Sequence, residues 1–77
     1  MARTFQDRDL LVWEVYPSAG DHGYSQRPHL VFNCLSERTA RPRFVELDGD
    51  EADGEKLTAT ATDDDLRTLF ERAKVVT

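Results

Sequence analysis

The chain has 77 residues, 39% hydrophobic and 32% charged, which suffices for one small domain over residues 1–77 and argues against a wholly disordered chain. The net charge of −5 arises in residues 48–65, where eight acidic residues accompany one lysine, so a general affinity for nucleic acid is not expected. The single cysteine excludes an intramolecular disulfide. No apolar run approaches the ~20 residues that cross a bilayer and no signal-peptide pattern is present, so we expect a cytoplasmic protein without membrane insertion.

The first half of the chain predicts antiparallel strands joined by turns. The expected strands are residues 3–6, 10–17, 27–37 and 41–47. Because side chains alternate between the two faces of a strand, one apolar set should face the core: Leu11, Trp13, Val15, Leu30, Phe32 and Cys34. The complementary set, which includes Tyr16, His29 and Val31, should lie on the outer face.

We interpret residues 48–56 as a solvated acidic loop, because charged residues and glycines follow one another there without an apolar period. In residues 56–61, Leu57, Ala59 and Ala61 alternate with polar residues. This alternation suits either a short edge strand or a merely extended segment.

Residues 62–74 carry the strongest local signal, which predicts a C-terminal helix. Thr62 is a suitable N-cap, and Asp63–Asp65 follow it where the helix terminus is electropositive. One apolar stripe runs along the segment: Leu66, Leu69, Phe70 and Ala73. Because an isolated helix of this length is marginal in water, the stripe should dock on the sheet. The predicted fold class is α+β, an antiparallel three- to four-stranded β-meander with one C-terminal α-helix packed on one face.

Four short motifs occur in order along the chain: F-x-D, W-x-V, R-P-x-L-x-F and a T-D-D-D-L helix start. In these motifs the chain resembles a group of short uncharacterised bacterial proteins found mainly in the Gemmatimonadota. The matching residues are Phe5, Asp7, Trp13, Val15, Arg27, Pro28, Leu30, Phe32, Asp63 and Leu66. The resemblance spans most of the chain and implies a shared fold but no activity. The chain departs from the group at the first turn, where a glycine is expected, and in the acidic stretch 48–56.

The acidic stretch ELDGDEADGEK (46–56) invites comparison with a calcium-binding loop. An EF-hand loop needs oxygen ligands at fixed positions, a central glycine and a terminal glutamate. A loop that starts at Asp48 ends on Ala59, and one that starts at Gly49 lacks the first ligand. Neither register fits, so we expect no calcium site.

The reactive residue types do not form a convincing catalytic or metal-binding set. Cys34 should be a buried strand residue, and His29 lies an odd number of positions away, on the opposite face. His22 and His29 lack further ligands nearby, so no metal or other cofactor is expected. Helix capping accounts for Asp63–Asp65.

The charged residues outside these segments suggest a surface for binding. The possible interaction surface comprises Arg38, Arg41, Arg43, Asp48, Asp50, Glu51, Asp53 and Glu55. We expect a small non-enzymatic protein-interaction module or accessory subunit of a larger bacterial assembly, with another protein as its partner. A self-pairing edge strand would make it a homodimer.

Two alternatives come from other classes of function. The first is an anion- or nucleic-acid-binding domain that uses four arginines: Arg27, Arg38, Arg41 and Arg43. The second is a small enzyme, which has the weakest support because no nucleophile lies beside a base.

Overall fold

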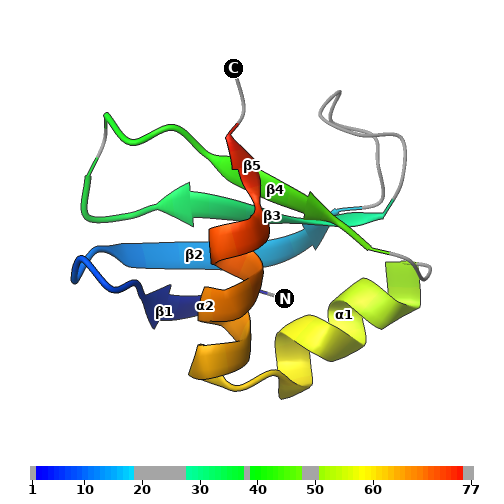
Figure 1. Cartoon of the computed structure of the whole chain (residues 1–77). Coiled ribbons are helices and arrows are strands. Elements are labelled where there is room, and N and C mark those ends of the chain that lie inside the picture. Colours follow the sequence, from blue (N-terminus) through cyan, green and yellow to red (C-terminus); the bar gives the residue numbers. More distant parts are fainter. Residues whose placement is uncertain (1, 19–27, 38, 48–50, 76–77) are drawn as a thin grey trace.

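The computed structural model describes residues 2–18, 28–37, 39–47 and 51–75. It shows a five-stranded antiparallel sheet in the order β1-β2-β3-β4-β5, with two helices (Figure 1). The elements are β1 (Arg3–Gln6), β2 (Val12–Ser18), β3 (His29–Cys34), β4 (Arg43–Glu46), α1 (Glu51–Thr60), α2 (Asp63–Arg72) and β5 (Lys74–Val75). The α+β class and the antiparallel meander are confirmed. The expected number of strands and the single helix are wrong.

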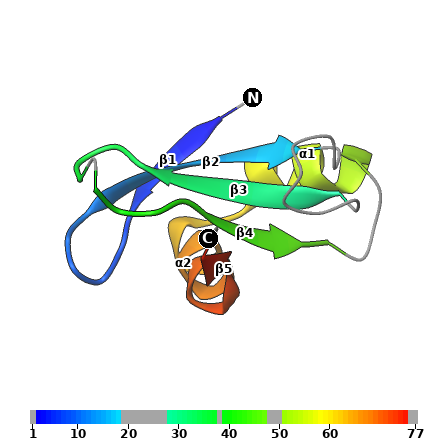
Figure 2. The same ribbon diagram turned by 90° about the horizontal axis from the view of Figure 1, so that it is seen from above.

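The core lies between the sheet and α2, which crosses the strands on one face (Figures 1 and 2). Trp13 is 3% exposed, and the prediction that its face of the sheet forms the core is confirmed. The ring of Phe70 on α2 lies 4.6 Å from that of Trp13, 5.7 Å from that of Phe5 and 5.6 Å from that of Phe32. Phe70 therefore brings aromatic side chains from three strands into contact with one helix.

Residues 51–60 form the helix α1, although the sequence predicts an acidic loop (48–56) followed by a short edge strand or extended segment (56–61). Leu57 of α1 and Ala61, the residue that follows the helix, both pack against the core, whereas Ala59 is exposed. The alternation in the sequence was misleading because this spacing satisfies both a strand and a helix.

Gly54 lies inside α1 although glycine has a low helix propensity. The reason is that the helix approaches the sheet closely at this position. A Cβ at this position would lie 3.1 Å from Cδ1 of Leu47 and 3.4 Å from Cβ of Pro17. The buried hydroxyl of Thr58 donates to the Gly54 carbonyl oxygen at 2.8 Å, so this polar group is satisfied inside the helix.

The C-terminal helix ends before the predicted limit of residue 74. Ala73 has extended dihedral angles (φ −72°, ψ 148°), and its N–H donates to the Phe70 carbonyl oxygen at 3.1 Å. The chain then runs beside β4, where Lys74 is opposite Phe44 and Val75 is opposite Arg43. The free edge of β4 thus supplies backbone partners that end the helix and create β5.

The prediction that His29 and Val31 lie on an open outer face is also wrong. His29 is 0% exposed, and its ring meets that of Phe44 edge-on at 5.9 Å. Val31 is opposite Tyr16 on one side and Phe44 on the other. Because β3 is the central strand, larger side chains on the neighbouring strands cover it on this face as well.

A substitution at the start of α2 would measure how much the local helix cap contributes to the free energy of unfolding. The Thr62 hydroxyl accepts from the Asp65 N–H and the Asp65 carboxylate accepts from the Thr62 N–H, each at 3.2 Å. Thr62→Ala should lower the free energy of unfolding by about 1 kcal/mol in a urea titration. Thr60→Ala is the matched control: Thr60 is exposed in α1 and alanine is a good helix former, so the change should stay within about 0.5 kcal/mol. A larger loss from Thr60→Ala would contradict this assignment.

Candidate site between the first turn and the C-terminal helix

The turn between β1 and β2 is organised by the carboxylate of Asp7. Its Oδ1 accepts from the backbone N–H groups of Asp9 at 2.8 Å and Leu11 at 2.9 Å. Its Oδ2 accepts from Nε1 of Trp13 at 2.7 Å in a buried hydrogen bond. Both carboxylate oxygens are therefore used, and the same group holds the turn and orients the core indole.

Leu10 stands at the tip of this turn in an unfavourable backbone conformation. Its φ is +68°, the only positive φ of a non-glycine residue in the described ranges, and its side chain is 72% exposed. A side chain with a Cβ destabilises this left-handed region by roughly 1 kcal/mol. The turn retains it because the Leu10 N–H donates to the Asp7 carbonyl at 3.1 Å and the Gln6 side chain donates to the Leu10 carbonyl at 3.1 Å.

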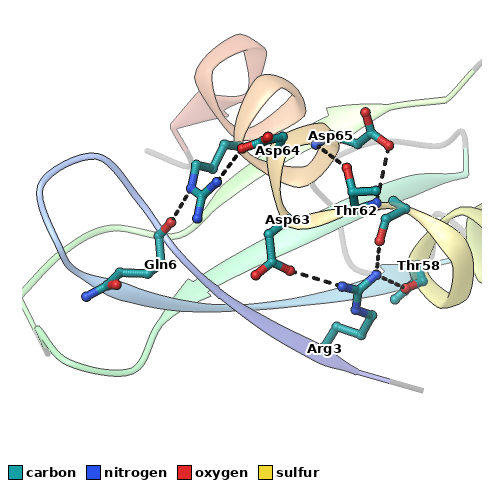
Figure 3. Close-up of polar contacts among 9 residues, drawn as sticks. Arg3, Gln6, Thr58, Thr62, Asp63, Asp64 and Asp65 are labelled. Atoms are coloured by element: carbon teal, nitrogen blue, oxygen red, sulfur yellow. Dashed lines mark hydrogen bonds and ion pairs between the residues drawn. The ribbon is translucent and has the colours of Figure 1, made fainter.

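Side chains of α2 reach across to the same turn. Nε of Arg67 donates to the Gln6 carbonyl oxygen at 2.7 Å, while its second nitrogen pairs with Asp64 at 2.6 Å (Figure 3). Nε of Arg8 lies 3.3 Å from a carboxylate oxygen of Glu71. Arg67 thereby satisfies a main-chain acceptor at the edge of β1, which limits strand addition at this point.

Arg3 fastens the other end of β1 to the junction of the two helices. Its guanidinium donates to the carbonyl oxygens of Thr58, at 3.2 Å, and of Ala61, and it pairs with the carboxylate of Asp63 at 3.1 Å (Figure 3). These carbonyls lie at the C-terminal end of α1, where the helix leaves acceptors unpaired. One side chain thus fixes both helices relative to the sheet.

Two adjoining hollows lie between the turn and α2 and share Asp7, Arg8 and Arg67. The inner hollow has a volume of about 320 Å³, and its other lining residues are Asp9, Arg43, Phe70 and Glu71. The outer hollow has a volume of about 470 Å³, and its other lining residues are Gln6, Leu10, Asp64 and Thr68. Both are open depressions on the surface.

Arg43 forms the floor of the inner hollow together with Phe70. It projects from the core face of β4, and its Cζ lies 4.4 Å from the centroid of the Phe70 ring and 5.8 Å from that of the Trp13 ring. Arg43 is half-buried. A guanidinium held over aromatic rings is attracted by their negative faces, more strongly where water is partly excluded.

The structure describes only some of the predicted interaction residues. Arg41 is exposed and precedes β4, so it does not share a strand face with Arg43 as expected. Asp53 and Glu55 are exposed on α1, and Glu51 begins that helix. Arg38, Asp48 and Asp50 of the predicted surface lie outside the described ranges, as do Arg27 of the alternative anion-binding set and His22. Among the described residues of the predicted surface, Arg43 lies on β4 and Asp53 and Glu55 lie on α1.

The reactive residue types are dispersed. Cys34 is partly buried against the core, and His29 lies on the opposite face of the same strand. In the part of the chain that the structure describes, no three His, Cys, Asp or Glu side chains gather in a group that could hold a metal ion. Within those same residues, no helix is long and apolar enough to span a membrane.

Sequence reasoning missed the residues that surround the two hollows. Leu10 was assigned to a strand, although a hairpin turn of DRDL without glycine or asparagine indicates backbone strain. Arg67 pairs with Asp64 and with the Gln6 carbonyl, and Arg3, which is 60 positions away from Asp63 in the sequence, pairs with Asp63.

Comparison of the chain with models of known protein families, with curated proteins and with solved structures finds no match in any of the three. The evidence on function is therefore the geometry of the chain itself.

Removal of the Asp7 carboxylate should be strongly destabilising. Asp7→Ala leaves the buried indole N–H of Trp13 and two backbone N–H groups of the turn without their acceptor, so the free energy of unfolding should fall by about 3 kcal/mol in urea. Asp9→Ala is the control, because Asp9 is exposed and its own carboxylate takes no part in holding the turn, and it should change stability by less than about 0.5 kcal/mol. Equal losses would refute the central role of Asp7.

Leu10→Gly should make the protein more stable, although the substitution removes a large side chain. Glycine adopts positive φ readily, and the relief should exceed the entropy that glycine adds to the unfolded chain by about 0.5–1 kcal/mol. Leu35→Gly is the matched control: Leu35 is also exposed, has no positive φ, and should lose stability. The midpoint temperature of thermal unfolding should rise for Leu10→Gly and fall for Leu35→Gly. A change in the same direction for both variants would rule out strain at position 10.

Proposed function

We propose that the protein is a small non-enzymatic protein-interaction module, an accessory subunit of a larger bacterial assembly that works in the cytoplasm. Its contact surface would be the turn surface, defined as Leu10, Leu35 and the two hollows beside α2. The observation that supports this proposal most is Leu10, a large apolar side chain that is 72% exposed on a backbone of unfavourable φ. Strained conformations of this kind persist mostly where a function needs them.

Leu35, which is 51% exposed, adds to the same surface. It follows β3, and the connection from β3 to β4 lies at the same end of the sheet as the β1–β2 turn (Figure 1). The Leu35 N–H donates to the Val12 carbonyl oxygen at 2.9 Å, which holds it beside the strand that leaves the turn. Both exposed leucines thus lie at the same end of the sheet, where a partner could cover them together.

A binding role fits the chemistry of the hollows better than catalysis does. The Asp7 carboxylate accepts three N–H groups, Glu71 pairs with Arg8, and Asp64 pairs with Arg67. A general base or nucleophile needs a free lone pair directed at the substrate, whereas these groups hold one another in place. Such a network favours a rigid docking surface.

The second candidate, anion binding, is favoured by one described residue. Arg43 has no carboxylate partner in the described ranges and lies in a hollow. Arg41→Ala together with Arg43→Ala should abolish any binding of single-stranded nucleic acid that falls steeply with salt concentration. The acidic residues of α1 and of the first turn of α2 weigh against a long polyanion as the ligand.

The proposal is tested by placing a photo-crosslinking residue at position 10 and, as a control, at exposed Ala59 of α1 in cells of the source organism. Position 10 should give one discrete crosslinked protein and position 59 should not. The purified pair should then lose at least about tenfold in affinity with Leu10→Gly, because a buried leucine is worth ~1.5–3 kcal/mol.

The Leu10→Gly variant makes this experiment decisive, because the same change should raise stability and lower affinity. Unfolding would lower both. Val75→Ser, at an exposed apolar position on β5, should leave affinity unchanged. Unchanged binding by Leu10→Gly would refute the turn surface, and a crosslink to a second copy would make the partner a homodimer subunit.

A further inference from the structure

The guanidinium of Arg43 is held in a geometry that leaves its hydrogen-bond donors available. Its Cζ lies over the ring of Phe70, 4.4 Å from the centroid, and farther away over that of Trp13, at 5.8 Å. A guanidinium has five N–H donors, and contact with aromatic rings leaves most of them able to bind an acceptor. Within the described part of the chain Arg43 forms no ion pair. It therefore lines the inner hollow as a half-buried cation without a bound carboxylate.

Most of the other charged groups of the inner hollow already have partners, among them Arg67, which pairs with Asp64. Glu71 lies 3.3 Å from Arg8, and both oxygens of Asp7 accept N–H groups of the turn and of the indole. Asp9 is exposed at the rim and is the remaining carboxylate of the lining. The hollow thus has a cationic floor with an acidic rim, which admits one negative charge more readily than several.

The size of the inner hollow suits a small occupant such as one side chain. Its volume of about 320 Å³ is near the lower end of the range for ligand sites, which is ~300–1,000 Å³. Phe70 supplies an apolar wall that suits methylene groups, and the in-plane donors of Arg43 suit the two oxygens of a carboxylate. A glutamate or aspartate side chain combines both features, whereas a phosphate dianion would meet the acidic rim at twice the charge.

We propose that the inner hollow binds an acidic side chain of the partner protein, with its carboxylate on the guanidinium edge of Arg43 and its stem against Phe70. This inference rests on the proposed interaction function and names the chemistry that the partner presents. The adjacent Leu10 would contact an apolar residue of the same partner segment, because Leu10 lines the outer hollow, which shares Asp7, Arg8 and Arg67 with the inner one.

The test uses four small probes and no partner protein. N-acetyl-glutamic acid α-amide carries only a side-chain carboxylate, and N-acetyl-glutamine amide is its neutral isostere. N-acetyl-leucine carries only a main-chain carboxylate, and inorganic phosphate is the fourth probe. In ¹H–¹⁵N spectra, the glutamate probe should shift the Trp13 indole and Arg43 Nε–H signals saturably, with Kd on the order of millimolar for so small a ligand. The glutamine probe should not.

Variants locate the site. Arg43→Gln should weaken binding of the glutamate probe at least tenfold, and Arg43→Lys should weaken it as well because an ammonium cannot form the bidentate contact. Arg72→Gln, an exposed position on α2 that lines neither hollow, should bind as the wild type does. The comparison of glutamate with glutamine probes on the wild-type protein needs no variant, so it stands even if Arg43→Gln fails to fold.

Each contrary outcome overturns the proposal. Equal shifts from the glutamate and glutamine probes would exclude charge recognition, and tighter binding of phosphate or N-acetyl-leucine would exclude an acidic side chain as the occupant. Retained binding in Arg43→Gln would place the anion elsewhere. Because the probes act without a partner, failure here leaves the effect of Leu10→Gly on partner binding intact, so the two proposals fail separately.

Discussion

The hydrogen bond from the Trp13 indole to the Asp7 carboxylate is the interaction on which the rest of the structure depends. Its length is 2.7 Å and it is buried, while the other oxygen of the same carboxylate fixes two N–H groups of the β1–β2 turn. The indole in turn lies against Phe70, a residue of α2 whose ring also contacts the guanidinium of Arg43. One carboxylate therefore sets the turn, the core and the helix relative to one another, and the two hollows exist where they meet.

The acidic character of the chain has a structural explanation that does not require a ligand. Many of the negative charges in the described part of residues 48–65 lie at the starts of the two helices, where unpaired N–H groups make the terminus electropositive. Asp63 also binds Arg3, and Asp64 binds Arg67. The acidic first turn of α2 thereby pairs with a base of β1 and with a base of its own helix, whereas Arg43 forms no ion pair within the described part of the chain.

Several side-chain contacts fasten β1 to the two helices. Arg3 holds β1 to the helix junction, and Arg67 closes part of the edge of β1, so strand addition there is hindered while the turn stays exposed. Leu10 and Arg43 then differ from their surroundings in opposite ways. Leu10 is an apolar side chain exposed to water, and Arg43 is a cation that has no carboxylate partner among the described residues. Both lie beside the β1–β2 turn.

The sequence by itself determined the elements whose signals are local. Alternation placed Trp13, Val15 and Phe32 in the core, and the Thr62 cap with its apolar stripe defined α2, because a strand face or a helix face can be read from a few neighbouring residues. Tertiary structure decided the features that depend on distant residues. The spacing of Leu57 and Ala61 suits both a strand and a helix, and the helix is the form in which Gly54 approaches Leu47 and Pro17 closely. The strand β5 forms because the edge of β4 offers backbone partners.

The candidate site belongs almost wholly to this second group. Nothing near position 43 in the sequence indicates that its guanidinium rests on the ring of a phenylalanine 27 positions later, and nothing near position 10 gives the sign of its φ. Both follow from how the turn, the sheet and α2 pack together. The helices and strands can thus be predicted from residues that are close together in the sequence. The residues that line the hollows cannot, because contacts between distant segments leave no local sequence pattern.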